Sequence, residues 1–459
     1  TISYPHPGWV EQDANEIWLA CLAVMSEVIL KSKISPEQVA AIGISNQRET
    51  SVLWDASTGL PVSPAIVWQS KQTKSICDSW KEKGYEDVVK TKTGLRIDPY
   101  FSASKIRFIF DQNPDVYEKA KKGEVLFGTM DSWIVWKLSG SLTHITDVSN
   151  ASRTLLFNIH TLSWDEELLE MFDIPRQILP EVKPTSYAYC KTASYHFFGK
   201  EVPICSVVGD QQAALFGQGC FSAGGIKNTY GTGGFMLMNT GDKIVESKNG
   251  LLSTVAWQIG NQVNYALEGS IFVSGSLMKW LRDQLQLFEN TKDTQGMAES
   301  VENTNGVYIV PAFVGLGAPY WDDACQATIV GLTFGANKNH IVRAALESMA
   351  YQSKDVLEAM KQDSQIEISS MKVDGGAAAN NFLLQFQSDL LQMPVQRFKT
   401  NELTALGAAY LAGLSCGYWT QDELGVDLQK EFVPEKSKEE MDSLYSNWKK
   451  AVKTCQSYK

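Results

Sequence analysis

One carboxylate in this sequence stands where an apolar strand gives way to a helix. Residues 204–208 predict a buried strand, Gly209 and Asp210 follow it, and residues 213–217 are small and helix-forming. In open α/β sheets, ligands bind at the carboxyl ends of the strands. Asp210 could therefore be a general base that removes a proton from a substrate hydroxyl, or it could simply cap the helix that follows.

Two glycine-rich turns could bind an anion. The turn Gly231-Thr232-Gly233-Gly234 joins predicted strands at 226–230 and 235–239, and its backbone N–H groups and hydroxyl could form an anion-binding concavity. The turn Asp374-Gly375-Gly376 follows a predicted strand at 371–374 and opens a helix, whose N-terminus favours phosphate oxygens, while Asn380 could bond a sugar or base. An ordinary hairpin and a closely packed helix start are the alternatives. Neither turn has the Walker or the dinucleotide pattern.

A third candidate is the polar run Asn46-Gln47-Arg48-Glu49-Thr50, which follows a predicted buried strand at 39–45. Arg48 can only donate hydrogen bonds and ionised Glu49 can only accept them, so the two could hold neighbouring hydroxyls. An ion pair or a solvated turn is the alternative. Trp68, Tyr100 and Phe235 could pack on the carbon face of a polyol, although aromatic residues beside strands usually belong to the core.

The elements that must position these residues alternate between helix and strand. Asp13, with Glu16 three residues on, predicts the start of a long helix. Further helices are expected at 105–111, 131–138, 339–361, 404–414 and 438–454. A strand at 263–268 is expected to lead into a helix through Gly269 and Ser270. We therefore expect an α/β fold of two domains, 1–217 and 218–459, that can close on a ligand.

Composition narrows the functional class. The formal net charge of −11 argues against binding to nucleic acid, which needs a concentrated positive surface. The eight cysteines form no Cys-x-x-Cys pair, so reduced thiols and a cytoplasmic location are expected. The longest uncharged stretch, 404–420, is shorter than the roughly 18–20 apolar residues of a membrane span, and no signal peptide is visible.

Together these segments resemble one family, the FGGY carbohydrate kinases, and within it the branch that acts on glycerol. The resemblance runs from Pro5-His6-Pro7-Gly8-Trp9 to the C-terminal helix. Its most distinctive segments are 45–50 (SNQRET), 209–215 (GDQQAAL), 227–233 (KNTYGTG), 265–270 (YALEGS), 311–313 (PAF) and 374–376 (DGG).

The resemblance implies an actin-like ATPase fold of two RNase-H-like domains flanking a cleft, with glycerol, ATP/ADP and Mg²⁺ as ligands. The hydroxyls of glycerol would bind Arg48, Glu49 and Tyr100, and its carbons would contact Trp68 and Phe235. Asp210 would be the general base and a Mg²⁺ ligand, with Gln211 beside it. The ATP phosphates would lie on Gly231, Thr232 and Gly233. Gly275, Gly376 and Asn380 would line the adenosine site.

The resemblance also implies regulation and assembly. In Gram-positive members of this branch, a histidine in a Tyr-His-Phe-Tyr-Gly loop accepts phosphate from the phosphocarrier HPr, and Tyr195-His196-Phe197-Phe198-Gly199 matches it except at Phe198. A homodimer or homotetramer is implied as well. The segment Asp323-Ala324-Cys325-Gln326-Ala327 departs from the Glu-Ala-Arg-Gly-Ala pattern of the relatives.

One motif of the family is missing. Its members begin with strands that carry an Asp-Gln-Gly-Thr-Thr-Ser-type phosphate loop, and we expect those strands to precede Thr1 in the intact protein. If the loop were truly absent, a non-catalytic homologue would become the alternative. Another FGGY sugar kinase, acting on xylulose, ribulose or gluconate, is the alternative closer to the family assignment.

Overall fold

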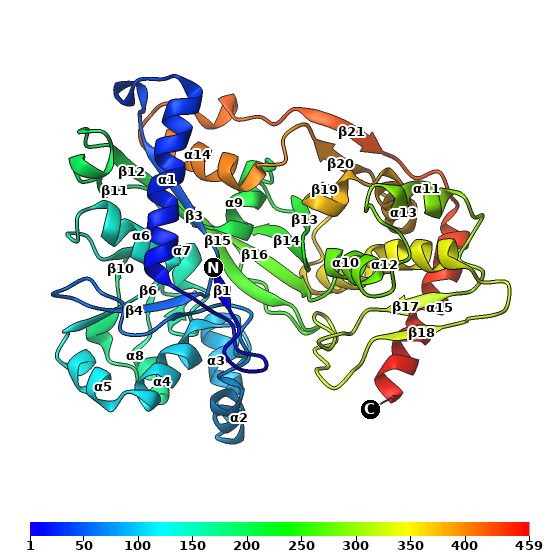
Figure 1. Cartoon of the computed structure of the whole chain (residues 1–459), viewed down its shortest axis with the longest axis horizontal. Helices are drawn as coiled ribbons and strands as arrows, with labels where there is room; N and C mark the ends of the chain where they lie inside the picture. The colour runs from blue at the N-terminus through cyan, green and yellow to red at the C-terminus, as the bar shows by residue number, and fades with distance from the viewer. Residues whose placement is uncertain (459) are drawn as a thin grey trace.

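A computed structural model describes residues 1–458 and is built around a ten-stranded sheet (Figure 1). The order of its strands is β21 (Leu428–Phe432), β20 (Val395–Phe398), β19 (Met371–Asp374), β13 (Ile226–Tyr230), β14 (Gly234–Gly241), β16 (Gln262–Ile271), β15 (Leu252–Ile259), β11 (Ser186–Lys191), β12 (Pro203–Gly209) and β3 (Ile42–Asn46). The sheet therefore contains strands from both halves of the chain.

A second, antiparallel sheet lies in the first half. It has the order β1 (Ile2–Ser3), β2 (Glu11–Gln12), β5 (Ala65–Ile66), β4 (Ser51–Asp55) and β6 (Val125–Thr129). Three two-stranded pairs complete the β structure: β7 (Ile145–Asp147) with β10 (Glu181–Lys183), β8 (Phe157–Asn158) with β9 (Ser163–Trp164), and β17 (Tyr308–Val310) with β18 (Thr328–Val330).

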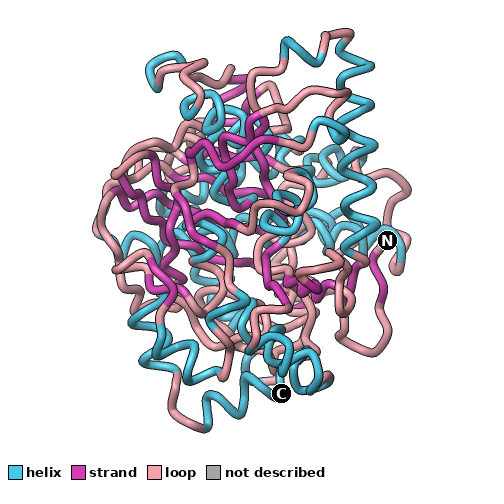
Figure 2. Tube along the Cα trace, turned by 90° about the vertical axis from the view of Figure 1, so that its left-hand side faces the viewer, coloured by secondary structure: helices cyan, strands magenta, loops and turns pink. Residues whose placement is uncertain are grey.

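Helices lie above, below and beside the strands in the view at right angles (Figure 2). In the first half they are α1 (Ala14–Ser32), α2 (Lys74–Glu82), α3 (Glu86–Thr93), α4 (Ser102–Gln112), α5 (Pro114–Lys121), α6 (Met130–Leu138), α7 (Val148–Ala151), α8 (Glu166–Phe172) and α9 (Asp210–Gly217). In the second half they are α10 (Gly275–Asp283), α11 (Asp293–Glu299), α12 (Lys338–Ser364), α13 (Asn381–Leu391), α14 (Leu403–Ser415) and α15 (Lys438–Ser457). Short 3₁₀ turns are η1 (Pro36–Gln38), η2 (Arg176–Ile178), η3 (Ser194–His196), η4 (Gly376–Ala379) and η5 (Gln421–Glu423).

The two halves of the chain meet inside the large sheet. Strand β11 pairs with β15 at one position, Ser186 opposite Ile259. Helix α14, orange in Figure 1, comes late in the chain but packs on β3, β12 and α9 of the first half. A hydrophobic cluster that contains Val208, Leu215, Leu237 and Leu411 fills this junction. The junction holds the ends of β12 and β13 in fixed relation to each other.

Most of the elements predicted from the sequence are present. Asp13 accepts a hydrogen bond from the Asn15 N–H at the start of α1, as predicted. The large apolar cluster of the second half forms around α12, the helix predicted at 339–361. Hydrophobic periodicity was sufficient to predict these helices because each of them packs one face against a hydrophobic core.

Two predictions about strands were wrong in detail. The strand expected at 39–45 begins only at Ile42, and it lies half-buried at the edge of the sheet. The strand expected to end at Glu268 continues through Gly269 and Ser270 to Ile271, because it pairs with β14 over that length. A glycine in a strand often marks close approach of another group rather than an end, and the Gly269 Cα faces Val356 of α12.

All eight cysteines are free in the structure, as expected for reduced thiols. In the described part of the chain, no helix combines the length and apolar character that crossing a bilayer requires.

Candidate functional site

The carboxyl ends of two neighbouring strands place Arg48, Glu49 and Asp210 together. Strands β3 and β12 are parallel, with Asn46 opposite Gly209, so the chain leaves both strands at the same edge of the sheet. The Arg48 Nε lies 3.3 Å from an Asp210 carboxylate oxygen and 3.7 Å from Glu49 Oε1. This edge of an open sheet is where ligands are expected.

Asp210 does not cap the helix that follows it, which was the alternative role for this residue. Gly209 is the N-cap residue of α9, and Asp210 is the first helical residue. Its Oδ1 accepts a hydrogen bond from the Gln211 N–H at 2.7 Å, and 35% of its side chain is exposed. The Asp210 carboxylate is thus accessible to a ligand that binds at the carboxyl ends of β3 and β12.

The charges around Asp210 adjust its basicity. Burial raises the pKa of Asp210, while the nearby cations Arg48 and Lys227 oppose that rise. Burial lowers the pKa of Lys227 to about 8, and its ammonium donates to the side chains of Gln211 and Thr229. A carboxylate with a raised pKa is a stronger base than one in water, which suits proton removal from a hydroxyl.

The backbone at Glu49 is strained and strongly anchored. Its φ is +60°, a left-handed conformation that costs a non-glycine residue energy. Its carbonyl accepts hydrogen bonds from Ser51 Oγ, Ser102 Oγ and Lys105 Nζ at 3.1–3.2 Å. Such strain persists where the surroundings over-determine the conformation, which is typical of functional sites.

Lys105 is one of the groups that hold this backbone. Its ammonium is fully buried and also donates to the carbonyl of Tyr100. Burial lowers the pKa of Lys105 to about 7. Lys105 therefore holds the backbone carbonyls of two predicted binding residues, Glu49 and Tyr100.

An aromatic chamber of about 850 Å³ lies beside these charges. The ring of Trp68 makes edge contacts with the rings of Tyr100, at 5.7 Å, and Phe235, at 5.9 Å between centroids. The chamber is also lined by Thr232 and Gly233 of the hairpin. The structure thus joins the predicted aromatic wall and one predicted anion-binding turn in one cavity.

Two of the residues expected to bind the nucleotide, Gly275 and Gly376, lie beside the hairpin tip. Gly275 begins α10 and donates its N–H to the Gly231 carbonyl at 2.9 Å, and a Cβ on Gly275 would lie 2.6 Å from that oxygen. Strand β19 is parallel to β13, and this places Gly375 against Tyr230 and Gly376 in open space beside the tip. Asn380 caps α13 through the Leu383 N–H and bonds Thr294, so its side chain is already engaged.

Gly375 and Gly376 offer a matched pair of substitutions. Gly375 has φ +89°, and a Cβ there would lie 2.4 Å from the Tyr230 carbonyl. We expect Gly375→Ala to lower the free energy of unfolding by at least about 1–2 kcal/mol from conformation alone. Gly376→Ala meets no atom within 4 Å and serves as the control. Thermal denaturation measures both, and equal melting temperatures would contradict the expectation.

Sequence reasoning missed four charged residues of the site. Arg153 and Glu268 are fully buried and bond to Glu49 and Arg48, while Lys105 and Lys227 are described above. Glu268 carried a usable signal, because it follows Ala266 and Leu267 in a predicted strand and a charge is buried only when it is paired. Lys227 stands beside Asn228 and Thr229 in its strand and carried no such signal. Lys105 lies in helix α4 and Arg153 in the turn after α7, where charged residues are ordinary, so no pattern singled them out.

His196 lies away from the chamber. It ends the turn η3, is half-buried, and its ring contacts Trp18 of α1 edge-on at 4.9 Å and Tyr195 at 4.3 Å. Burial lowers the pKa of His196, and Lys137 nearby adds to this effect. The imidazole is therefore neutral and nucleophilic at physiological pH.

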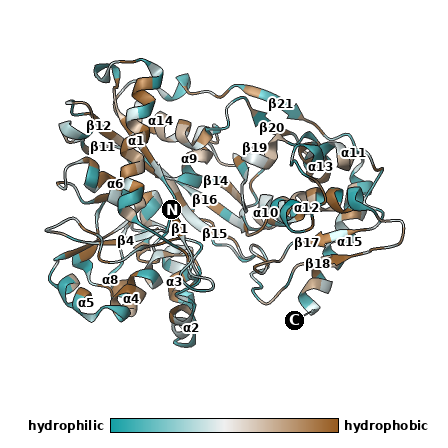
Figure 3. Ribbon diagram, in the orientation of Figure 1, coloured by the Kyte–Doolittle hydropathy of each residue, from teal (hydrophilic) through white to brown (hydrophobic). Residues whose placement is uncertain are grey.

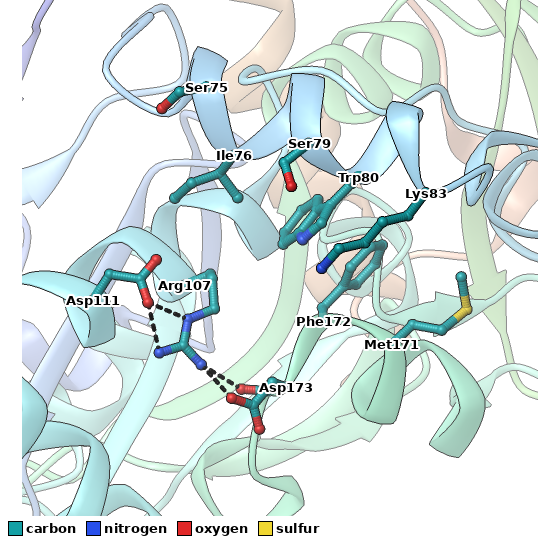
Figure 4. Close-up of a pocket in the computed structure, with 10 residues that line it drawn as sticks. All are labelled: Ser75, Ile76, Ser79, Trp80, Lys83, Arg107, Asp111, Met171, Phe172 and Asp173. Atoms are coloured by element: carbon teal, nitrogen blue, oxygen red, sulfur yellow. Dashed lines mark hydrogen bonds and ion pairs between the residues drawn. The ribbon is translucent and has the colours of Figure 1, made fainter.

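A second hollow of about 410 Å³ lies between α2, α4 and α8 (Figure 4). Arg107 projects into it, but its guanidinium is engaged by Asp111 and by the carboxylate and carbonyl of Asp173. The guanidinium of Arg107 is therefore neutralised by two neighbouring carboxylates.

Comparison with known proteins agrees with this geometry. The profile of the FGGY family of carbohydrate kinases, N-terminal domain, matches residues 1–217, and that of the C-terminal domain matches residues 226–416. The glycerol kinase of Geobacillus sp. (strain WCH70) is 58% identical over 459 residues, covering 99% of this chain and 92% of the relative. The glycerol kinase of Bacillus subtilis (strain 168) is 57% identical with the same coverage.

Solved structures lead to the same family. The crystal structure of Plasmodium falciparum glycerol kinase with ADP has a TM-score of 0.92 and 36% identity, covering 99% of this chain and 92% of that one. A gluconate kinase from Lactobacillus acidophilus, 21% identical with a TM-score of 0.86 and coverages of 98% and 92%, shares the fold. The predicted two-domain, actin-like α/β fold is confirmed. This chain belongs to the FGGY family of carbohydrate kinases.

Proposed function

We propose that this protein is a glycerol kinase, which transfers the γ-phosphoryl group of ATP to glycerol and releases sn-glycerol 3-phosphate and ADP in glycerol catabolism. The observation that carries the proposal is the Asp210 carboxylate 3.3 Å from Arg48, whose guanidinium also donates to Tyr100 in the lining of the aromatic chamber. The identity of 57–58% to glycerol kinases over nearly the whole chain supports this substrate.

In the proposed reaction, Asp210 accepts the proton of one glycerol hydroxyl as the oxygen of that hydroxyl bonds to the γ-phosphorus. The bond from that phosphorus to the bridging oxygen breaks, and ADP leaves with the electron pair. Arg48, Glu49 and Tyr100 orient the other hydroxyls, Trp68 and Phe235 cover the carbons, and Gln211 lies beside the reacting group. Positioning and charge stabilisation supply most of the catalysis in phosphoryl transfer.

The nucleotide would bind on the second half of the chain, with its phosphates on Gly231, Thr232 and Gly233. Gly275, Gly376 and Asn380 would border the adenosine. We accordingly place the functional division near residue 218, with glycerol held mainly by 1–217 and ATP by 218–459.

Mg²⁺ fits the residues of this site. It binds through one or two carboxylates together with substrate phosphates. The exposed part of Asp210 can supply one such carboxylate, and the buried Oδ1 of Asp374 lacks a hydrogen-bond partner among the described residues. The ion would neutralise phosphate charge when bound, and Asp210 is the ligand we propose for it.

A coupled assay of glycerol 3-phosphate and ADP formation tests the proposed function. Glycerol is expected to be the preferred acceptor in a panel with xylulose, ribulose and gluconate. Preference for one of the sugars would assign the protein to another branch of the family. Binding of glycerol and ATP without turnover would favour a sensor over an enzyme.

We also propose that His196 accepts a phosphoryl group from phosphocarrier HPr. Incubation with HPr phosphorylated at its histidine is expected to label His196 and raise kinase activity, because the neutral imidazole is partly accessible on its turn. His196→Ala should abolish the label, while His160→Ala, on an exposed turn bonded to the Thr91 carbonyl, should keep it. Absence of label on His196 would reject this proposal.

Assembly and location are the remaining parts of the proposal. Helix α1 exposes the apolar side chains of Leu19, Val24 and Val28 by 55–61%, and much of it is coloured as apolar in Figure 3. A homodimer or homotetramer would bury this face, and light scattering measures the mass.

The eight free cysteines are consistent with action in the reducing cytoplasm.

A further inference from the structure

Four buried charges form a closed ring behind the chamber. Arg48 Nη1 lies 2.6 Å from Glu268 Oε2, and Arg153 Nη2 lies 2.8 Å from Glu268 Oε1. Arg153 Nε lies 2.6 Å from Glu49 Oε1, and Arg48 Nε completes the ring at 3.7 Å from the same oxygen. Each of the four side chains is at most 2% exposed.

The ring joins the two halves of the chain. Arg48, Glu49 and Arg153 come from the first half, whereas Glu268 comes from β16 in the second. Glu268 pairs with Leu237 on β14 and with Leu252 on β15, so its backbone is held from both sides. Its carboxylate is therefore a fixed point against which the flexible Arg48 side chain is oriented.

The ring is not explained by stability alone. Buried ion pairs lose so much hydration that apolar residues of the same volume are often as stable. Arg153 Nη1 has no hydrogen-bond partner among the described residues, so the ring is not even fully satisfied. A costly arrangement of this kind is best accounted for by what it positions, namely Arg48, which contacts both Asp210 and Tyr100 of the chamber.

We propose that Glu268 is a positioning residue for the glycerol site. It holds the Arg48 guanidinium in an orientation in which Arg48 pairs with two carboxylates, Glu268 and Asp210. This inference rests on the proposed function and assigns a role in binding the acceptor to a residue of the half that holds the nucleotide. Glu268 contacts no substrate atom itself, and it acts through Arg48 and Arg153.

Glu268 carries a full negative charge within the ring. Burial alone would raise its pKa, but Arg153 and Arg48 outweigh burial and lower the pKa of Glu268 to about 2, so it is ionised at working pH. The carboxylate therefore attracts both guanidinium groups and holds them in place.

Glu268→Gln tests the proposal, with Glu268→Asp as the variant that keeps the charge. We expect Glu268→Gln to raise the glycerol KM and the calorimetric glycerol Kd about 10- to 100-fold, the range of a lost charge-assisted hydrogen bond. The ATP KM should stay within about twofold. Glu268→Asp keeps the charge and should lose less glycerol affinity than Glu268→Gln.

The matched control is Glu347→Gln, which removes a buried carboxylate from a separate ion pair with Arg343. It should lower the melting temperature without changing the ratio of the two KM values. If Glu268→Gln does not fold, Arg153→Lys replaces it, because lysine cannot bridge Glu49 and Glu268 together and should also weaken glycerol selectively.

Equal rises in both KM values, or an unchanged glycerol Kd in folded Glu268→Gln, would overturn the inference. Unchanged glycerol affinity in Arg153→Lys would do the same where that variant is used. If the unmodified protein binds glycerol without phosphorylating it, the proposed function fails, and calorimetry on the variants still decides the role of Glu268. If the unmodified protein does not bind glycerol, both fail.

Discussion

Asp210→Asn is expected to lower kcat by about 10²- to 10⁴-fold, the usual contribution of a general base. The amide keeps the size of the side chain and can still accept from the Gln211 N–H, but it cannot take the hydroxyl proton. Glycerol affinity should change little, because Arg48, Glu49 and the aromatic chamber remain. Steady-state kinetics give kcat, and calorimetry gives the glycerol Kd.

Asp13→Asn is the control for this substitution. Asp13 caps α1, and asparagine caps helices as well as aspartate does, so activity should be unchanged. In the unmodified protein, kcat/KM should fall as pH decreases through the pKa of Asp210, above the ordinary aspartate value because burial raises it. This acid limb should disappear in Asp210→Asn. Near-normal turnover of Asp210→Asn would remove it from the mechanism.

Arg48→Ala is expected to raise the glycerol KM about 100-fold while the ATP KM changes far less, because truncating one partner of a buried charge pair costs several kcal/mol. The guanidinium also donates to Tyr100 Oη and Gln212, so several groups of the acceptor site lose their orientation at once. Initial rates with each substrate varied in turn measure the two KM values.

Stability should fall in Arg48→Ala, but by less than the about 3–5 kcal/mol of a fully orphaned buried charge. Arg153 still pairs with Glu268 when Arg48 is absent, which limits the loss. Arg48→Lys should be intermediate, since it keeps the charge without the bidentate geometry. Arg282→Ala, an exposed arginine paired with its neighbour Asp283, is the control. Equal changes in both KM values would contradict the assignment of Arg48 to glycerol.

Local sequence patterns were sufficient to predict many of the strands, helices and turns of this protein. A strand that ends in Gly-Asp before a helix, a glycine-rich hairpin and a strand that ends in Asp-Gly-Gly are all visible in the sequence, because period and turn chemistry are local properties. The family resemblance rests on the same segments. The end of β16 was misjudged because Gly269 looked like a turn, whereas it pairs with Met236 of β14, more than thirty residues earlier in the chain.

What the amino-acid sequence determined by itself is the set of elements, the family and the residue types at the strand ends. The tertiary structure alone decided that Glu268 from one half meets Arg48 and Arg153 from the other, and that Lys105 holds the strained backbone of Glu49. The physical reason is that a buried charge is defined by its partners in space. No periodicity along the chain encodes contacts such as these, between residues that are 56 to 220 positions apart.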